Sequence, residues 1–380
     1  MMVLVMMVAS ILGAAGTVLA TPTGSHGSAS GDAVLTWNAN ASDAALAACI
    51  APTDDPLHES HMYAMTHLAI HDALNAIDRR YQPYAFFGHA SRSSSTDAAV
   101  ATAARDVLVP VLGQIPAPFP QACIDAAIAS VEADYVAALG AIPAGPSKRK
   151  GIDVGAASAA AILELRTDDG SDTPLLDVDQ PQGTEPGEYR FTPGTPFAFA
   201  PGWGEVTPFV LRSSSQFRAD APYAITESAY IADFEEVKRL GGNGTTTPSD
   251  RTAEQTEIAL FWVESSPLQW NRIARTLAEE GLDLWEQARL FGLLNMSLAD
   301  GYVGSFETKY LYNFWRPVTA IQLAATDDNP DTDADPTWAP LVPTPPIPDH
   351  DSAHSVEGAR RHRSSAGSSE RTGSASRPAA

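Results

Sequence analysis

The sequence contains few lysines, few cysteines and few long apolar stretches. Only four of its 380 residues are lysine, and acidic residues outnumber basic ones by 46 to 24, giving a formal net charge of -22. This acidic excess disfavours a nucleic acid or an anionic membrane surface as a partner. No stretch after residue 20 is long and apolar enough to span a membrane, so we expect no stable membrane partner. Because the chain as a whole is acidic, any cationic pocket must be confined to a few residues.

The N-terminus reads as an export signal. Residues 1–20 are apolar and end in Val18-Leu19-Ala20, ahead of a polar stretch. We therefore expect a secreted or extracytoplasmic protein, although no lysine or arginine precedes the apolar run, which leaves an uncleaved anchor or a misassigned start codon open. Cys49 and Cys123 could pair after export, and two buried thiols are an equal alternative.

The remaining chain predicts an all-α fold. AVLTWN reads as a short apolar entry, and a helical pattern begins near Asp43. Apolar spacings of three and four predict a long amphipathic helix within 58–84. Further helices are expected at about 97–113, 119–139, 148–167, 222–240, 250–264, 267–289 and 291–314. No alternating pattern favours strands.

A long segment rich in Gly, Pro and aromatic residues interrupts the helices, and a loop of this length is usually functional or tightly packed. It divides the chain into a signal or anchor, a polar linker, an N-terminal bundle, an irregular connection, a C-terminal helical region and a tail. The signal or anchor is 1–20, the polar linker 21–33 and the N-terminal bundle 34–168. The irregular connection is 169–221, the C-terminal helical region 222–358 and the tail 359–380.

The strongest candidate site lies near the end of the sequence. Lys309 and Arg316 are seven residues apart, so in one continuous helix they would project from the same face. Their neighbours are largely aromatic, and a buried cationic pair needs an anion, which makes an oxyanion the natural ligand. Downstream, Ser352 supplies a hydroxyl, Ala353 a backbone amide at an expected helix start, and His354 an imidazole that titrates near neutral pH.

Other interpretations of these charged residues stay open. The two cations could instead pair with Asp300, Glu307 or the acidic loop 327–336, and Asp300 could orient one of them. In that loop Asp331, Asp333 and Asp335 follow the spacing of a calcium loop. However, Pro336 and Val342 stand where an EF-hand needs Gly and Glu, so we expect a solvated loop.

A histidine pair offers a second metal hypothesis, which the sequence favours less. His67 and His71 are one helical turn apart, and Asp72 is adjacent. The pattern is not H-E-x-x-H, and no third ligand is evident. We expect core or surface histidines and no metal.

These motifs resemble the vanadium-dependent haloperoxidases and their relatives, the type 2 phosphatidic-acid phosphatases and bacterial acid phosphatases. The resemblance rests on K-x6-R-P at 309–317, on the P-S-G-H-like element ending at His354, and on the W-G-x-V-x-P-F-x-L and Q-F-R segments of the connection. It covers about 34–358 and implies two helical bundles, the second incomplete and holding the pocket. It further implies vanadate as cofactor, with phosphate as the alternative occupant.

By this resemblance Lys309, Arg316 and Ser352 bind the oxyanion together with the Ala353 amide, and His354 is the acid-base residue. The first expectation is an exported haloperoxidase-like enzyme that oxidises a halide with hydrogen peroxide. An acid phosphatase acting on a phosphate ester and a catalytically silent helical protein are the alternatives. A homo-oligomer stays open.

The sequence departs from the family pattern at three places. Ala353 replaces Gly, and Asp351 replaces Pro, which puts a negative charge near the anion site. The second Arg and final His that the resemblance implies have no counterpart after His354, so we expect weak or no turnover. The tail 359–380 carries five Arg and one Glu, against the acidic remainder. We expect it to be a shifted reading frame of the family's next helix, because GC-rich codons shifted by two bases encode AAQVLRRFFGT.

Overall fold

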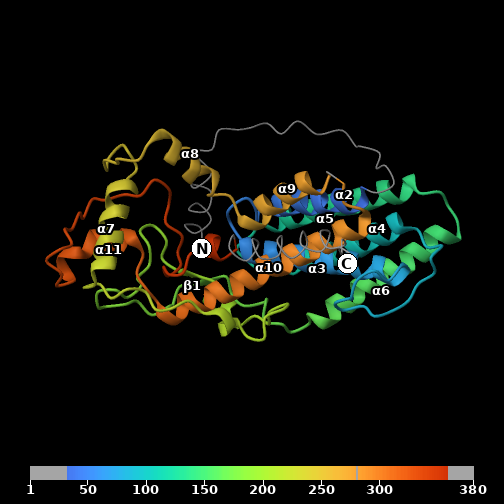
Figure 1. Cartoon of the computed structure of the whole chain (residues 1–380), viewed down its shortest axis with the longest axis horizontal. Helices are drawn as coiled ribbons and strands as arrows, with labels where there is room; N and C mark the ends of the chain where they lie inside the picture. Colours follow the sequence, from blue (N-terminus) through green and yellow to red (C-terminus); the bar gives the residue numbers. More distant parts are fainter. Residues whose placement is uncertain (1–31, 280, 358–380) are drawn as a thin grey trace, which may run out of the picture.

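The computed structural model describes residues 32–279 and 281–357, and these are mostly helical. A helical bundle forms one end of the molecule, and a smaller group of helices forms the other (Figure 1). The long helix α10 (Leu284–Tyr312) runs from the first into the second. The expected all-α fold is confirmed. The expected leader and the tail 359–380 lie outside the described residues.

The elements have the following bounds. The bundle holds α2 (Ala33–Ala47), α3 (Pro56–Ile77), α4 (Thr96–Gly113), α5 (Gln121–Ala141), α6 (Pro146–Leu165), α9 (Ser266–Ala278) and the first half of α10. The smaller group holds α7 (Ser228–Leu240), α8 (Ala253–Phe261) and α11 (Pro317–Leu323). The short helix η4 (Ala324–Thr326) follows α11 and packs in the smaller group. The connection holds the short helices η2 (Pro201–Glu205) and η3 (Ser214–Phe217) and an antiparallel pair, β1 (Leu176–Asp177) and β2 (Ala198–Phe199).

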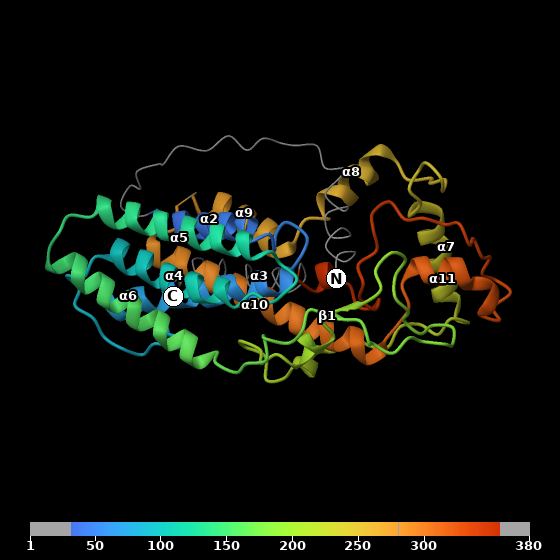
Figure 2. The same ribbon diagram turned by 180° about the vertical axis from the view of Figure 1, so that it is seen from behind.

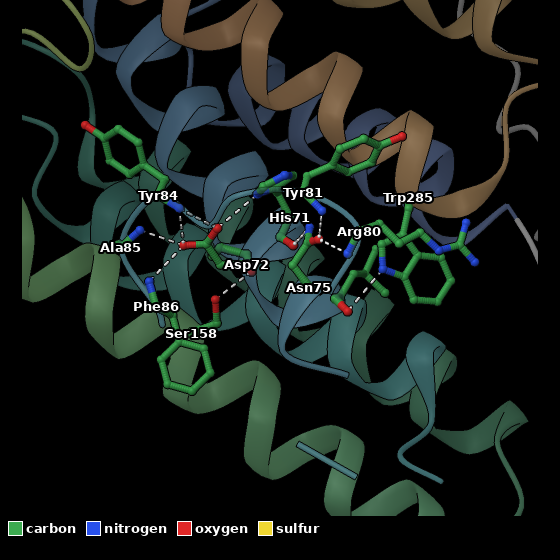
Figure 3. Close-up of polar contacts among 12 residues, drawn as sticks. His71, Asp72, Asn75, Arg80, Tyr81, Tyr84, Ala85, Phe86, Ser158 and Trp285 are labelled. Atoms are coloured by element: carbon green, nitrogen blue, oxygen red, sulfur yellow. Dashed lines mark hydrogen bonds and ion pairs between the residues drawn. The ribbon is translucent and has the colours of Figure 1, made fainter. Parts of the chain in front are cut away.

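Helix α3 is the centre of the bundle, and the expectation that it is amphipathic is wrong. Every residue after Pro56 is buried, because α4, α6, α9 and α10 all pack around it. Asp55 caps its start by accepting the backbone N–H of His58 at 3.1 Å. Near its end, Asp72 accepts the backbone N–H groups of the loop residues 84–86 at 2.6–3.1 Å (Figure 3).

Two helix boundaries differ from the expectation. The apolar entry AVLTWN is the start of α2, where Trp37 is buried in the bundle core. The helix expected over 267–289 is two helices, because Gly281 has φ +123° and Asp283 begins α10 by accepting the backbone N–H groups of Trp285 and Glu286. A local apolar pattern does not show such a break.

The long connection does not separate two independent cores. Leu268 of α9 and Phe291 of α10 belong to the same hydrophobic cluster as the helices before the connection. Figure 2 shows α9 beside α2 and α10 beside α3. Parts of the connection are packed against the helices. Its Trp203 is 1% exposed, and Asp169 joins Arg166 at 2.7 Å and His61 of α3 at 2.8 Å. Within 32–279 and 281–357, no helix has both the length and the apolar character that a membrane span requires.

The two cysteines form a disulfide. Cys49, just after α2, is bonded to Cys123 in the first turn of α5, and their Cα atoms are 5.8 Å apart. The structure therefore decides between the two alternatives that the sequence left open. The bond closes a long loop that includes all of α3 and α4.

Candidate functional site

Lys309 lies in the last turn of α10 and is only 2% exposed. Its Nζ donates to the carbonyl oxygen of Pro348 at 3.2 Å and also to that of Asp351, so the loop before Ser352 wraps around the ammonium group. Burial, and then the positive charge of Arg316, lower the pKa of Lys309 to about 8. A buried lysine with this pKa still carries its charge at neutral pH.

Arg316 does not lie on the same helix as Lys309, so the expectation of one continuous helix is wrong. Helix α10 ends at Tyr312, Asn313 adopts a left-handed conformation with φ 47°, and Arg316 is the residue before α11. The two cations are brought close by this turn and not by a shared helical face. Nη1 of Arg316 is 3.5 Å from Oδ1 of Asp349, and its Nε is buried without a hydrogen-bond partner among the described residues.

His354 is electrostatically linked to Lys309. The residue is exposed, and Nε2 lies 3.5 Å from the carbonyl oxygen of Glu264. Desolvation by neighbouring atoms lowers the pKa of His354, and the charge of Lys309 lowers it further. The imidazole is therefore mainly neutral at neutral pH and can accept a proton.

Ser352 and Ala353 begin the short helical turn that carries His354. Ser352 is exposed, and its Oγ accepts the backbone N–H of Ser355 at 3.4 Å. Ala353 packs against the aromatic cluster around Trp203. Over the described part of the chain, no hydrogen bond joins Ser352 or Ala353 to the two cations. Their role as ligands stays a prediction.

Asp300 and Glu307, two of the alternative partners of the two cations, are bound elsewhere. Asp300 accepts three backbone N–H groups of the connection, and Glu307 forms an ion pair with Arg218. Asp351, the expected negative charge near the anion, accepts a hydrogen bond from Ser305 Oγ at 2.6 Å. Asp349 is thus the carboxylate in contact with Arg316.

The structure gives no support to either metal hypothesis. Within the described residues, no group of three or more His, Cys, Asp and Glu could hold a metal ion. His67 is fully buried with Nε2 2.7 Å from Nδ2 of Asn38, and burial lowers its pKa to about 3. Nδ1 of His71 lies 2.9 Å from the Asp72 carboxylate (Figure 3). These histidines are parts of the core.

Sequence reasoning missed one residue beside Arg316. Tyr189 belongs to the connection, is fully buried, and donates its backbone N–H to the carbonyl oxygen of Asn313 at 2.8 Å. The only sequence signal was its place in an aromatic-rich loop.

Comparison with known proteins identifies relatives for this region. A family model described as the VCPO second helical-bundle domain matches residues 289–363, which include every predicted site residue. Vanadium chloroperoxidase of Curvularia inaequalis is 28% identical over 190 residues. In this region the chain is similar to the vanadium haloperoxidases. The match to the Curvularia protein covers 42% of this chain and 30% of that relative's length.

Solved structures share the fold of this chain. A bacterial vanadium-dependent iodoperoxidase superposes with a TM-score of 0.65 at 20% identity, covering 87% of this chain and 79% of that one. A holo-type bacterial vanadium-dependent chloroperoxidase gives a TM-score of 0.63 at 14% identity, covering 86% and 79%.

Proposed function

We propose that this protein binds vanadate with Lys309, Arg316 and Ser352 and oxidises a halide with hydrogen peroxide. The observation that carries this proposal is the convergence of two cations, one of them 2% exposed, beside the loop that leads to Ser352 and His354. Buried cations without an anionic ligand are costly. The buried Nε of Arg316, which has no partner among the described residues, is a donor that an oxyanion would satisfy. Lys309 and Arg316 therefore fit the charge of the cofactor. Because the second Arg and final His of the resemblance have no counterpart after His354, we expect weak or no turnover.

Each residue has a chemical role in this proposal. Lys309 and Arg316 neutralise the oxyanion, and the Ser352 hydroxyl and the Ala353 amide donate to its oxygens. Neutral His354 accepts a proton from hydrogen peroxide. It returns this proton to the peroxide oxygen that leaves as water when the other oxygen is transferred to the halide. Vanadate, when bound, supplies the electrophilic activation of peroxide toward the halide.

Calorimetry with vanadate and a bromide-oxidation assay test the proposal. Lys309→Met and Arg316→Met should each weaken vanadate binding at least tenfold, because each removes a charge-assisted contact. Lys238→Met is the matched control, since Lys238 donates to the carbonyl oxygen of Asp333 in another part of the fold. Vanadate affinity that is equal in all three variants would contradict the proposal.

The same pocket chemistry also suits a phosphate ester, so the assay needs a second arm. Hydrolysis of p-nitrophenyl phosphate should be absent if the protein is a haloperoxidase. Vanadate should stimulate bromide oxidation by a haloperoxidase and inhibit a phosphatase, since it occupies the phosphate position. Absence of both activities, with vanadate still bound, would favour a silent binding protein.

We also propose that the protein acts outside the cytoplasm. The disulfide between Cys49 and Cys123 supports this, because such bonds persist mainly in oxidising compartments. Fractionation of a tagged full-length chain, with N-terminal sequencing of the mature form, tests it. Recovery of reduced protein only from the cytoplasm would contradict it.

A further inference from the structure

The hydroxyl of Tyr189 is a buried polar group that lacks a hydrogen bond. Tyr189 is 0% exposed, and its hydroxyl has no partner in the described part of the chain. Leaving such a group unsatisfied destabilises the folded protein. Buried unsatisfied groups are rare in folded proteins and need an explanation, such as a ligand that the site is built to hold.

The backbone holds Tyr189 beside the turn that positions Arg316. The N–H of Tyr189 donates to Asn313 at 2.8 Å, and the N–H of Trp315 donates to Gly187 at 2.9 Å. Residues 187–189 therefore run antiparallel to 313–315. Gly187 has φ +90°, a conformation that favours glycine, where this segment approaches the turn.

The opposite side of Tyr189 is also held. Its carbonyl oxygen accepts the N–H of Gly183 at 2.9 Å, so both backbone polar groups are engaged. Because both the N–H and the carbonyl of Tyr189 are hydrogen-bonded, the backbone fixes the position from which the side chain projects.

Arg316 and Tyr189 present two donors without an acceptor. Nε of Arg316 is buried and unpartnered among the described residues, as is the Tyr189 hydroxyl. The guanidinium is close enough to moderate the rise in the pKa of Tyr189 that burial causes. The net pKa stays above its usual value, so the phenol keeps its proton and can donate it in a hydrogen bond. The charge of Arg316 also lowers the pKa of Lys309, so Lys309 adds a second positive charge near Arg316.

We propose that the Tyr189 hydroxyl is a further ligand of the oxyanion, donating a hydrogen bond to an anion oxygen beside Arg316. This inference rests on the proposed oxyanion pocket and adds to it a residue from the connection. One oxyanion can accept hydrogen bonds from both Nε of Arg316 and the Tyr189 hydroxyl, because it offers several acceptor oxygens. A water molecule in the same place would satisfy the hydroxyl without any effect on anion affinity.

The experiment compares Tyr189→Phe with Tyr310→Phe. The hydroxyl of Tyr310 already donates to the carbonyl oxygen of Phe199 at 2.5 Å, so its loss removes a satisfied bond. Inorganic phosphate and vanadate are the probes, with dissociation constants from calorimetry and melting temperatures measured without anion. For Tyr189→Phe we expect about tenfold weaker binding of both anions and an unchanged or higher melting temperature, because a hydrogen bond to a charged group is lost only in the complex. For Tyr310→Phe we expect a lower melting temperature and affinity within about twofold.

The outcomes separate this inference from the proposed function. If Arg316→Met abolishes anion binding and Tyr189→Phe leaves it unchanged, the inference is overturned and the pocket stands. If neither variant affects binding, the pocket itself is wrong. A lower melting temperature for Tyr189→Phe with wild-type affinity assigns the hydroxyl to a bridging water and also overturns the inference.

A second measurement covers a Tyr189→Phe variant that does not fold. Wild-type protein labelled with carbon-13 at the tyrosine Cζ position is titrated with phosphate. The Tyr189 resonance should shift with the same dissociation constant as calorimetry, since its hydroxyl gains a bond to the anion. A Tyr189 resonance that does not move at saturating phosphate contradicts the inference.

Discussion

Oδ1 of Asp300 accepts a hydrogen bond from the backbone N–H of Phe209 at 2.6 Å. Its other oxygen accepts the N–H groups of Val210 and Leu211 at 2.8 and 2.9 Å. Asp300 is 2% exposed and lies on the same helix as Lys309. One carboxylate therefore fixes residues 209–211 of the connection against the helix that carries Lys309.

Replacement of Asp300 by alanine should lower the free energy of unfolding by about 3 kcal/mol or more, because three backbone donors lose a charged acceptor. Urea denaturation measures it. Asp177→Ala is the control, since Asp177 accepts one N–H, that of Asp179, at the surface, and should cost under about 1 kcal/mol. Equal losses in the two variants would contradict the assigned role of Asp300.

Anion binding should weaken as the pH rises through about 8. The pKa of Lys309 is lowered to about 8, chiefly by burial, so the ammonium group is charged below that pH and neutral above it. Sulfate is the suitable probe, because its own charge does not change over this range. Calorimetry between pH 6.5 and 9.5 should show the loss in wild type, and Lys309→Arg should bind sulfate with little pH dependence, because a guanidinium keeps its charge. A wild-type affinity that is flat across this range would exclude Lys309 as an anion ligand.

Glu59 of α3 should make the fold less stable as the pH rises. Glu59 is 0% exposed, and its Oε2 accepts a hydrogen bond from the Ser265 hydroxyl at 2.5 Å. Burial raises the pKa of Glu59 to about 8. A raised carboxyl pKa gives stability that is full below the unfolded value near 4.3 and is lost as the pH rises toward the folded value. Between about pH 5 and 8, wild type should therefore lose about 1.4 kcal/mol per pH unit relative to Glu59→Gln.

Unfolding free energies at several pH values test this role of Glu59. Glu257→Gln, at an exposed position of α8, is the matched control for removing a carboxyl charge. Parallel stability curves for wild type and Glu59→Gln would show that Glu59 does not retain its proton on folding.

Reduction of the disulfide should destabilise the protein without altering the pocket. Closing a loop of this length stabilises the folded state by about 4 kcal/mol in the chain-entropy description. The double variant Cys49→Ala, Cys123→Ala should therefore unfold at lower urea concentration and keep its vanadate affinity under native conditions. Stability that is unchanged in the double variant would show that the bond is not formed in solution.

The sequence alone determined the helical class, because apolar spacing and helix-ending residues are local signals. It also predicted the residues of the candidate site, since Lys309, Arg316 and His354 are recognisable by residue type and spacing. The reason it offered for the convergence of Lys309 and Arg316 was wrong. Asn313 ends α10 in a left-handed conformation, and the turn, not the helix period, brings the cations close.

Only the tertiary structure decided the contacts between distant segments. The burial of α3 on all sides, the pairing of Cys49 with Cys123 and the three donors on Asp300 depend on which elements pack together. Tyr189 is the clearest case, because nothing local distinguishes it from other aromatic residues of the connection. Its hydroxyl comes to lie near Arg316 only when two segments far apart in the chain form backbone hydrogen bonds, and a single sequence does not encode such a pairing in any local pattern.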